Sequence, residues 1–236
     1  MSKKYKLTNE TMTLAGGTVL HRIRALRDIP RFGVKAGELG GFVEEENNLS
    51  QDGDAWVSGK ARVSGNANVS DDAWVFGNAE VSGNAWVYGD AEVYDNANVY
   101  GNALVFGDAN VYGNAWVFGD ANVSDDAWVF GNAKVYGKAR VFGNAEIYDD
   151  AWVFGNACVS SDADYMVIKN TWSSGRWFTY TSSNKKWAVG CFYGTGEELV
   201  AKAYKDSKLS GKCYEAIVHA VETIEAAKAE AIGGME

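Results

Sequence analysis

The sequence predicts a mainly β protein: a parallel β-helix built from six-residue repeats, preceded by a β cap and followed by a small α+β domain. Three observations predict this fold. From residue 55 to residue 160 the pattern Ala-x-Val recurs every six residues, in eighteen consecutive hexads without insertion or deletion. Residues 1–42 are basic and contain short runs with strand character. The repeat ends before residue 163, so we expect three parts at residues 1–42, 43–162 and 163–236.

Each hexad predicts one short strand followed by one turn. Its first residue is Ala in all eighteen copies, and its third is Val in every copy except the one with Ile147. Residues around the Val alternate between outward and inward positions, which is the period of a strand. The pair that ends most hexads, such as Gly-Asn or Asp-Asp, turns the chain. A six-residue side is too short for a hairpin, so three hexads close one coil, and we expect about six to seven coils around a core of Ala and Val.

The Ala-x-Val-x-Gly-Asn repeat resembles the hexapeptide repeats of left-handed parallel β-helix proteins. The left hand is implied by this resemblance alone, because ordinary crossovers between parallel strands are right-handed. In this chain Ser, Phe or Tyr follows the Val and Gly comes one residue later. That variant, together with the approach at residues 40–54, is similar to hexapeptide proteins of bacteriophages and prophages. The resemblance therefore implies a phage-type protein, and it implies a homotrimer.

The N-terminal residues predict a β cap. Residues 4–7 and 18–26 have strand character, and a turn is expected at residues 15–17. A cap is needed because the first coil of a solenoid otherwise exposes unpaired backbone groups and invites end-to-end stacking. The start of the chain lacks an apolar core, and no apolar run is long enough to span a bilayer. We therefore expect neither a signal peptide nor a membrane partner, and we expect a cytoplasmic protein with three reduced, widely spaced cysteines.

Charge is distributed unevenly along the chain. Residues 1–42 hold eight Lys and Arg against three acids, residues 43–162 hold five against nineteen, and residues 163–236 hold nine against nine. The predicted solenoid is acidic and should repel DNA and RNA. Because Asp and Asn at the corners already turn the chain, we interpret them as solvated turn residues. We expect no metal and no cofactor.

Aromatic residues fill most of the outward positions that follow the inward Val. Twelve of the eighteen hexads carry Phe or Tyr there, and six carry Ser. Three explanations are open: the rings stack on one another, they pack against other copies in a symmetric oligomer, or they form a platform for a carbohydrate or another ligand. We favour the oligomer. A step of eighteen residues places one column on one face, and we predict it as the interface: Phe76, Tyr94, Tyr112, Phe130 and Tyr148.

Residues 163–236 predict a small α+β domain with three strands and two helices. Thr195-Gly196-Glu197-Glu198 is a capping box, which marks the start of the first helix. Apolar residues at helical spacing indicate the second helix. The domain also resembles the tail found on such phage proteins, a resemblance that implies no activity. The expected strands are residues 165–172, 177–182 and 186–192, and the expected helices end near residue 205 and span about 210–231.

The most suggestive segment for binding is residues 165–196, which carries four basic residues and no acid among many aromatic rings. Aromatic faces stack on bases, and Arg or Lys neutralises phosphates. The segment therefore suggests capture of a small anionic ligand, such as a nucleotide signal used in host defence. In the alternative interpretation the tryptophans form the domain core and the basic residues decorate turns. The candidate ligand-binding residues are Lys169, Trp172, Arg176, Trp177, Tyr180, Lys185, Lys186, Trp187 and Thr195.

Enzymatic activity is disfavoured by the placement of histidine. The resemblance also includes two classes of enzyme. Hexapeptide acyltransferases use a His general base on the solenoid, and the related γ-type carbonic anhydrases hold a metal with three His. Both chemistries need imidazole at the site. Residues 43–162 contain no His, and the two in the chain are His21 and His219. We predict a non-enzymatic binding protein; the alternatives are a structural spacer or protein-interaction scaffold and, less favoured, an acyltransferase.

Overall fold

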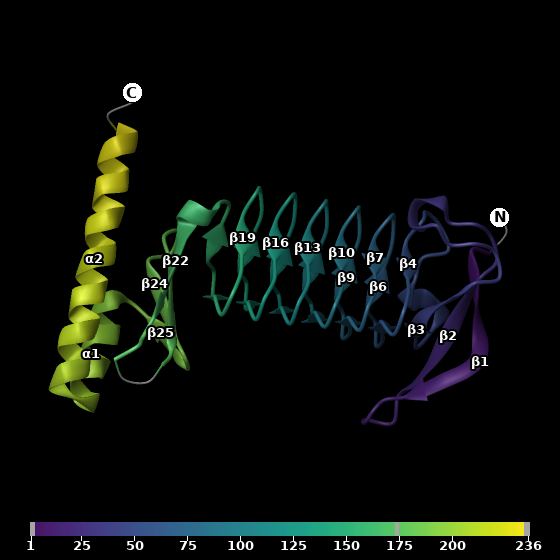
Figure 1. Cartoon of the computed structure of the whole chain (residues 1–236), viewed down its shortest axis with the longest axis horizontal. Helices are drawn as coiled ribbons and strands as arrows, with labels where there is room; N and C mark the ends of the chain where they lie inside the picture. The colour runs from purple at the N-terminus through teal and green to yellow at the C-terminus, as the bar shows by residue number, and fades with distance from the viewer. Residues whose placement is uncertain (1–2, 173–174, 234–236) are drawn as a thin grey trace. The chain divides into compact units, whose positions relative to one another are not determined.

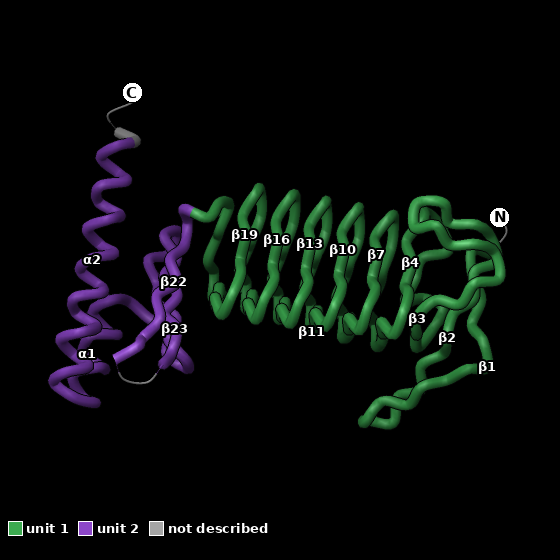
Figure 2. Tube along the Cα trace, viewed as in Figure 1, with its two compact units in different colours: residues 1–162 green, residues 163–236 purple. Residues whose placement is uncertain are grey.

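The computed structural model describes residues 3–172 and 175–233 and divides the chain into two compact units, residues 1–162 and 163–236 (Figure 2). Unit 1 contains the expected cap and all eighteen hexads, and unit 2 contains both α-helices. The last three residues of the expected α+β domain lie outside the described part, as do residues 173–174 of the candidate binding segment.

Together with the segment that precedes them, the hexads fold into a left-handed parallel β-helix of about seven turns, which confirms the predicted fold class (Figure 1). Every third strand pairs in parallel, so that Val57 lies opposite Val75 and Val63 lies opposite Val81. The backbone N–H of Ser58 donates to the carbonyl of Val75 at 2.9 Å. Each coil is therefore hydrogen-bonded to the next one along the axis.

The solenoid strands form three faces, each named here by its first strand. The β4 face consists of β4 (Trp56–Val57), β7 (Trp74–Val75), β10 (Glu92–Val93), β13 (Asn110–Val111), β16 (Trp128–Val129) and β19 (Glu146–Ile147). The β5 face consists of β5 (Arg62–Val63), β8 (Glu80–Val81), β11 (Asn98–Gly101), β14 (Trp116–Gly119), β17 (Lys134–Val135) and β20 (Trp152–Val153). The β6 face consists of β6 (Asn68–Val69), β9 (Trp86–Val87), β12 (Leu104–Val105), β15 (Asn122–Val123), β18 (Arg140–Val141) and β21 (Cys158–Val159).

The interior of the solenoid is made of the repeated Ala and Val side chains. All of them, and Ile147, are at most 1% exposed. Burying each Val stabilises the fold by about 1.5–3 kcal/mol. At the turns Gly adopts a left-handed conformation, and at Gly101, with a φ of 77°, an added Cβ would lie 2.9 Å from the backbone nitrogen of Gly119. Asp takes the same position in other hexads, for example Asp95 with a φ of 57°.

The cap continues the sheet of the β5 face. Strand β1 (Tyr5–Thr13) pairs antiparallel with β2 (Val19–Ala25), and β2 pairs antiparallel with β3 (Leu39–Val43). The end of β3 then pairs in parallel with β5. The cap thus converts an antiparallel sheet into the first parallel rung and pairs the backbone groups that the first coil would otherwise expose. Two short 3-10 helices complete the approach, η1 (Pro30–Phe32) and η2 (Glu46–Asn48).

Unit 2 begins with η3 (Asp162–Asp164) at its boundary and contains a four-stranded antiparallel sheet and two helices. Three strands are expected from the sequence, but the segment 186–192 is broken by a turn at Gly190, whose φ is 56°. Neither helix of the described chain has a stretch long and apolar enough to cross a membrane. The elements are β22 (Tyr165–Lys169), β23 (Trp177–Thr181), β24 (Lys186–Val189), β25 (Phe192–Gly194), α1 (Gly196–Asp206) and α2 (Lys208–Gly233).

Large side chains form the core of unit 2. Phe178 and Trp187 from the sheet are buried together with Leu199 of α1 and with Val218 and Val221 of α2. The rings of Phe178 and Trp187 meet edge-on, with centroids 6.3 Å apart. Edge-to-face pairs of this kind add about 0.5–1.5 kcal/mol to the effect of burial. The helices therefore cover one face of the sheet.

Candidate functional site

Three of the nine candidate ligand-binding residues lie in or against the core of unit 2. Tyr180 and Trp187 are only 6% and 2% exposed, and they point from the sheet toward the helices. The ring of Trp172 packs against the same core, and its centroid lies 6.2 Å from the centroid of the Phe178 ring. The pKa of the Tyr180 hydroxyl is raised to about 12, mainly by burial and to a smaller extent by the charges of nearby glutamates. These aromatic side chains fill the core instead of offering a free face to a ligand.

Other candidates lie on the opposite face of the sheet and are spread along it. Lys169 and Trp177 are register partners, and the Lys169 ammonium lies 4.8 Å from the centroid of the Trp177 ring. Lys186 pairs instead with Thr181, at the other end of β23. Trp177 and Thr181 are four steps apart along the strand, roughly 14 Å at about 3.4 Å per residue. The exposed Lys185 lies in the turn beyond, with a φ of 53°.

Arg176 and Thr195 occupy two further places. Arg176 lines a cavity of about 20 Å³ with Phe192 and Lys202, which is room for about one water molecule. The Thr195 hydroxyl accepts a hydrogen bond from the backbone N–H of Glu198 at 3.2 Å, so it caps α1 as the sequence predicts. In return the Glu198 carboxylate accepts from the Thr195 N–H at 2.8 Å, and this bond lowers the pKa of Glu198. The structure does not gather the nine residues into one pocket.

An open groove of about 910 Å³ lies between α1 and α2. None of the nine candidates lines it. Its three carboxylates outnumber its single ammonium group, so the groove disfavours an anionic ligand. The residues of α2 that line the groove recur every three or four positions, and this spacing in the sequence could have indicated that they share one face of the helix. The groove is lined by Glu197, Val200, Ala201, Lys212, Glu215, Ala216, Val218, His219 and Glu222.

On the solenoid, the predicted interface residues form one continuous stack of rings on the β4 face. Tyr94 and Tyr112 are almost parallel, with centroids 4.8 Å apart. A second ladder on the β5 face has spacings of 4.5–4.8 Å. Burial raises the pKa of Tyr94 to about 12, with the neighbouring Tyr112 and acidic groups adding to it. The β4 ladder is Phe76, Tyr94, Tyr112, Phe130 and Tyr148, and the β5 ladder is Tyr100, Phe118, Tyr136 and Phe154.

Ring stacking leaves large apolar groups exposed on every face. Trp128 of the β4 face is 43% exposed, Trp116 of the β5 face 40%, and Trp86 of the β6 face 51%. The ammonium of Lys134 lies between the rings of Trp116 and Trp152, at 5.1 and 4.9 Å from their centroids. Stacking along the ladders therefore leaves these tryptophan side chains exposed.

The three corners of the solenoid differ in chemistry. Between the β4 and β5 faces runs a ladder of amides, in which the Asn78 side chain donates to Asn96 at 3.1 Å and Asn96 donates to Asn114 at 3.3 Å. A second amide ladder separates the β5 and β6 faces. Between the β6 and β4 faces the equivalent positions are carboxylates, which cannot donate to one another and repel. We call this column the acidic corner: Asp54, Asp72, Asp90, Asp108 and Asp126.

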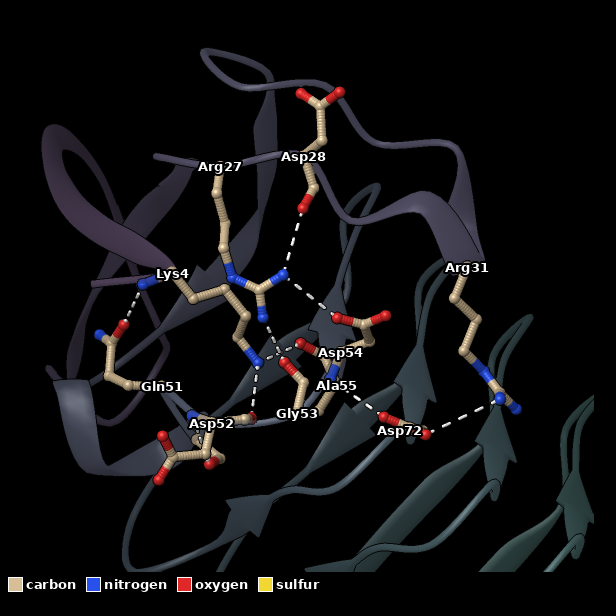
Figure 3. Close-up of polar contacts among 11 residues, drawn as sticks. Lys4, Arg27, Asp28, Arg31, Gln51, Asp52, Gly53, Asp54, Ala55 and Asp72 are labelled. Atoms are coloured by element: carbon tan, nitrogen blue, oxygen red, sulfur yellow. Dashed lines mark hydrogen bonds and ion pairs between the residues drawn. The ribbon is translucent and has the colours of Figure 1, made fainter. Parts of the chain in front are cut away.

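The cap binds the N-terminal end of the acidic corner, a contact that the sequence analysis did not predict (Figure 3). Arg27 pairs with Asp54 at 3.2 Å, and Arg31 pairs with Asp90 at 2.6 Å and with Asp72 at 3.9 Å. The recurrence of Asp at a step of eighteen residues, opposite a basic cap, was the available signal. Within the described ranges, no three His, Cys, Asp or Glu side chains converge as metal ligands would.

Lys4 closes the end of the solenoid beside this contact (Figure 3). Its side chain is buried, and the ammonium donates to the carbonyl of Ala55 at 2.8 Å and to that of Asp52 at 3.2 Å. Desolvation, followed in effect by the positive charge of Arg27, lowers the pKa of Lys4 to about 8. Lys4 therefore satisfies backbone carbonyls that lack a preceding coil.

A comparison with models of known protein families finds no match to the chain, and a comparison with curated proteins finds none either. The similarity of the repeat to phage hexapeptide proteins therefore stays a prediction, and function is inferred below from the geometry of the surfaces.

Proposed function

We propose that the protein is a non-enzymatic binding scaffold, in which three β-helices associate through their aromatic faces and carry the C-terminal domain. The observation that carries this proposal is the pair of ladders on the β4 and β5 faces, on which Tyr148 and Trp116 are each 40% exposed. Monomeric proteins rarely expose apolar surface over such a length. The solenoid fold is compatible with a scaffold that performs no chemistry.

Charge favours one arrangement of the three copies. In a three-fold assembly of prisms, one corner of each copy faces the axis. The acidic corner would bring three rows of carboxylates together, which like-charge repulsion opposes. The amide ladder of Asn78, Asn96 and Asn114 is neutral, and it lies between the β4 ladder and Trp116 of the β5 face. We place this corner at the axis, so that the predicted column from Phe76 to Tyr148 is buried.

Mass measurement of the assembled protein tests the arrangement. Native mass spectrometry should show three chains for the wild type and one chain when Tyr94 and Tyr112 are both changed to Ser. Ser occupies the same hexad position in six hexads, so the coil is retained. The matched control changes Tyr88 and Phe106 of the β6 face to Ser and should stay trimeric. A wild-type protein of one chain would refute the assembly, and a control that dissociates would move the interface to another face.

A second candidate function is capture of a small anionic ligand by unit 2, such as a nucleotide signal of host defence. The observation in its favour is the Lys169–Trp177 pair on the sheet face away from the helices, which offers a cation beside a ring. Titration calorimetry against a panel of cyclic nucleotides tests it, with Lys169→Ala and Trp177→Ala as variants that spare the core. Heat that both variants abolish supports this function, and no heat with any nucleotide rejects it.

A further inference from the structure

The triplet Asp-Ala-Trp occurs at three levels of the acidic corner, and the cap covers the first two. The triplets begin at Asp54, Asp72 and Asp126, and each places its Trp on the β4 face. At the first level, Arg27 pairs with Asp54 at 3.2 Å, and the ring of Tyr5 meets Trp56 edge-on at 6.5 Å. An arginine and an aromatic ring from the cap thus bind this triplet together.

The second triplet is bound by two consecutive residues of the cap. Arg31 reaches the carboxylates of Asp72 and Asp90, at 3.9 and 2.6 Å. Phe32 stacks on Trp74 with ring centroids 4.8 Å apart and an interplanar angle of 24°. A guanidinium that contacts carboxylates of two neighbouring coils, beside a ring that stacks on tryptophan, is therefore the observed occupant of this surface.

The third triplet, three coils further along, is open. Trp128 is 43% exposed, whereas Trp56 is 1% exposed. Within residues 3–172 and 175–233, neither the Asp126 nor the Asp108 carboxylate has an ion-pair partner. The third level differs from the second in two details. The coil after Asp72 carries Asp90 at the corner, whereas the coil after Asp126 carries Asn144, so the second carboxylate at the third level is that of Asp108 in the preceding coil. In addition, the ring of Tyr112 meets the ring of Trp128 edge-on, with centroids 6.1 Å apart.

We propose that Asp108, Asp126 and Trp128 form a docking site for a partner protein that presents an arginine next to an aromatic residue. The chemistry of the occupant follows from the two lower levels, where the chain itself supplies such pairs. The cap of a second copy is a poor occupant, because its own Arg27 and Arg31 are already bound to its own solenoid. The site lies on the corner that charge repulsion keeps away from the proposed three-fold axis, and it does not depend on that assembly.

A peptide copied from the cap is the probe. The labelled hexapeptide Ile-Pro-Arg-Phe-Gly-Val, residues 29–34 of the chain, is titrated with the full-length protein, and fluorescence anisotropy is measured. We expect saturable binding that Asp126→Asn and Trp128→Asn each weaken at least fivefold. Asn occurs at the same hexad positions of other coils, at Asn144 and Asn110, so both variants should fold. The matched control is Trp86→Asn, at a tryptophan that is 51% exposed and follows an amide corner, and it should bind like the wild type.

Changes in the peptide test the chemistry of the occupant. Replacing its Arg by Lys removes the planar fork that spans two carboxylates, and replacing its Phe by Ala removes the ring; each should weaken binding at least threefold. No binding at peptide concentrations on the order of 1 mM would overturn the proposal. So would equal binding to the wild type and Asp126→Asn, or a loss of the assembled state in Asp126→Asn, which would show that a second copy occupies the site.

Discussion

The two units of the protein use aromatic residues in opposite ways. In the solenoid of unit 1 the core is filled by Ala and Val, and the rings of Phe, Tyr and most Trp residues stand on the outside, whereas Tyr5 of the cap is buried. In unit 2 the core itself is aromatic, and Phe178 and Trp187 are buried. An aromatic residue therefore indicates a binding surface only where other side chains already fill the core. By this criterion the surfaces of the solenoid are better candidates for recognition than the tryptophan-rich segment of unit 2.

The largest contrast is expected between two Trp→Ala substitutions. Trp187→Ala should destabilise unit 2 by about 3–5 kcal/mol, because it removes a buried ring and leaves a cavity. Trp128→Ala should change the stability of unit 1 by no more than about 0.5 kcal/mol, because its ring lies on the surface. Hydrogen exchange followed separately in each unit measures both effects. Similar losses of protection in the two variants would remove the distinction between the units.

A turn substitution tests whether the repeat tolerates change at its corners. Gly101→Val should destabilise the solenoid by about 2 kcal/mol more than Gly101→Asp, because β-branched residues strongly disfavour positive φ. Asp already adopts this conformation at the equivalent position, as Asp95 does with a φ of 57°. Urea unfolding of the two variants gives the comparison. If the two variants lose the same free energy of unfolding, the positive φ does not restrict which residues are tolerated at this corner.

In unit 2, a smaller effect is expected at the start of α1. Thr195→Ala should cost about 1 kcal/mol, because the hydroxyl no longer accepts the N–H of Glu198. Thr195→Ser keeps the acceptor and serves as the control, and thermal unfolding of unit 2 measures both. If Thr195→Ala were as stable as the control yet lost a ligand, Thr195 would be a binding residue rather than a cap.

A pH dependence is expected at the junction of cap and solenoid. The pKa of Lys4 is lowered from 10.5 to about 8 in the folded protein. Between these pH values the unfolded chain keeps a proton on Lys4 that the folded chain releases, so stability should rise with pH across this window. The free energy of unfolding of the wild type, relative to that of Lys4→Met, should increase between pH 7.5 and about 9.5. A difference that stays constant, or that decreases, contradicts the assignment.

Local patterns predicted much of the fold. The eighteen hexads determine strand, turn, coil and core together, because each hexad packs on a neighbour of the same pattern. The capping box of Thr195 and Glu198 was also predictable, since its partners are three residues apart. The break of the third expected strand at Gly190 was not predictable, because Gly is compatible with both a strand and a turn. The column from Phe76 to Tyr148 was predicted to lie on one face, which it does, and its role as an interface stays a prediction.

The sequence by itself therefore determined the solenoid, its interior and its outward ladders, because periodicity along the chain becomes periodicity in space. Only the tertiary structure decided which face of the unit 2 sheet the helices cover, and so placed Trp187 in the core beneath them and Trp177 on the other face. It likewise decided that Arg31 lies on Asp90, since that contact depends on the path of the whole cap. Contacts between distant segments arise from packing, which local residue patterns do not encode.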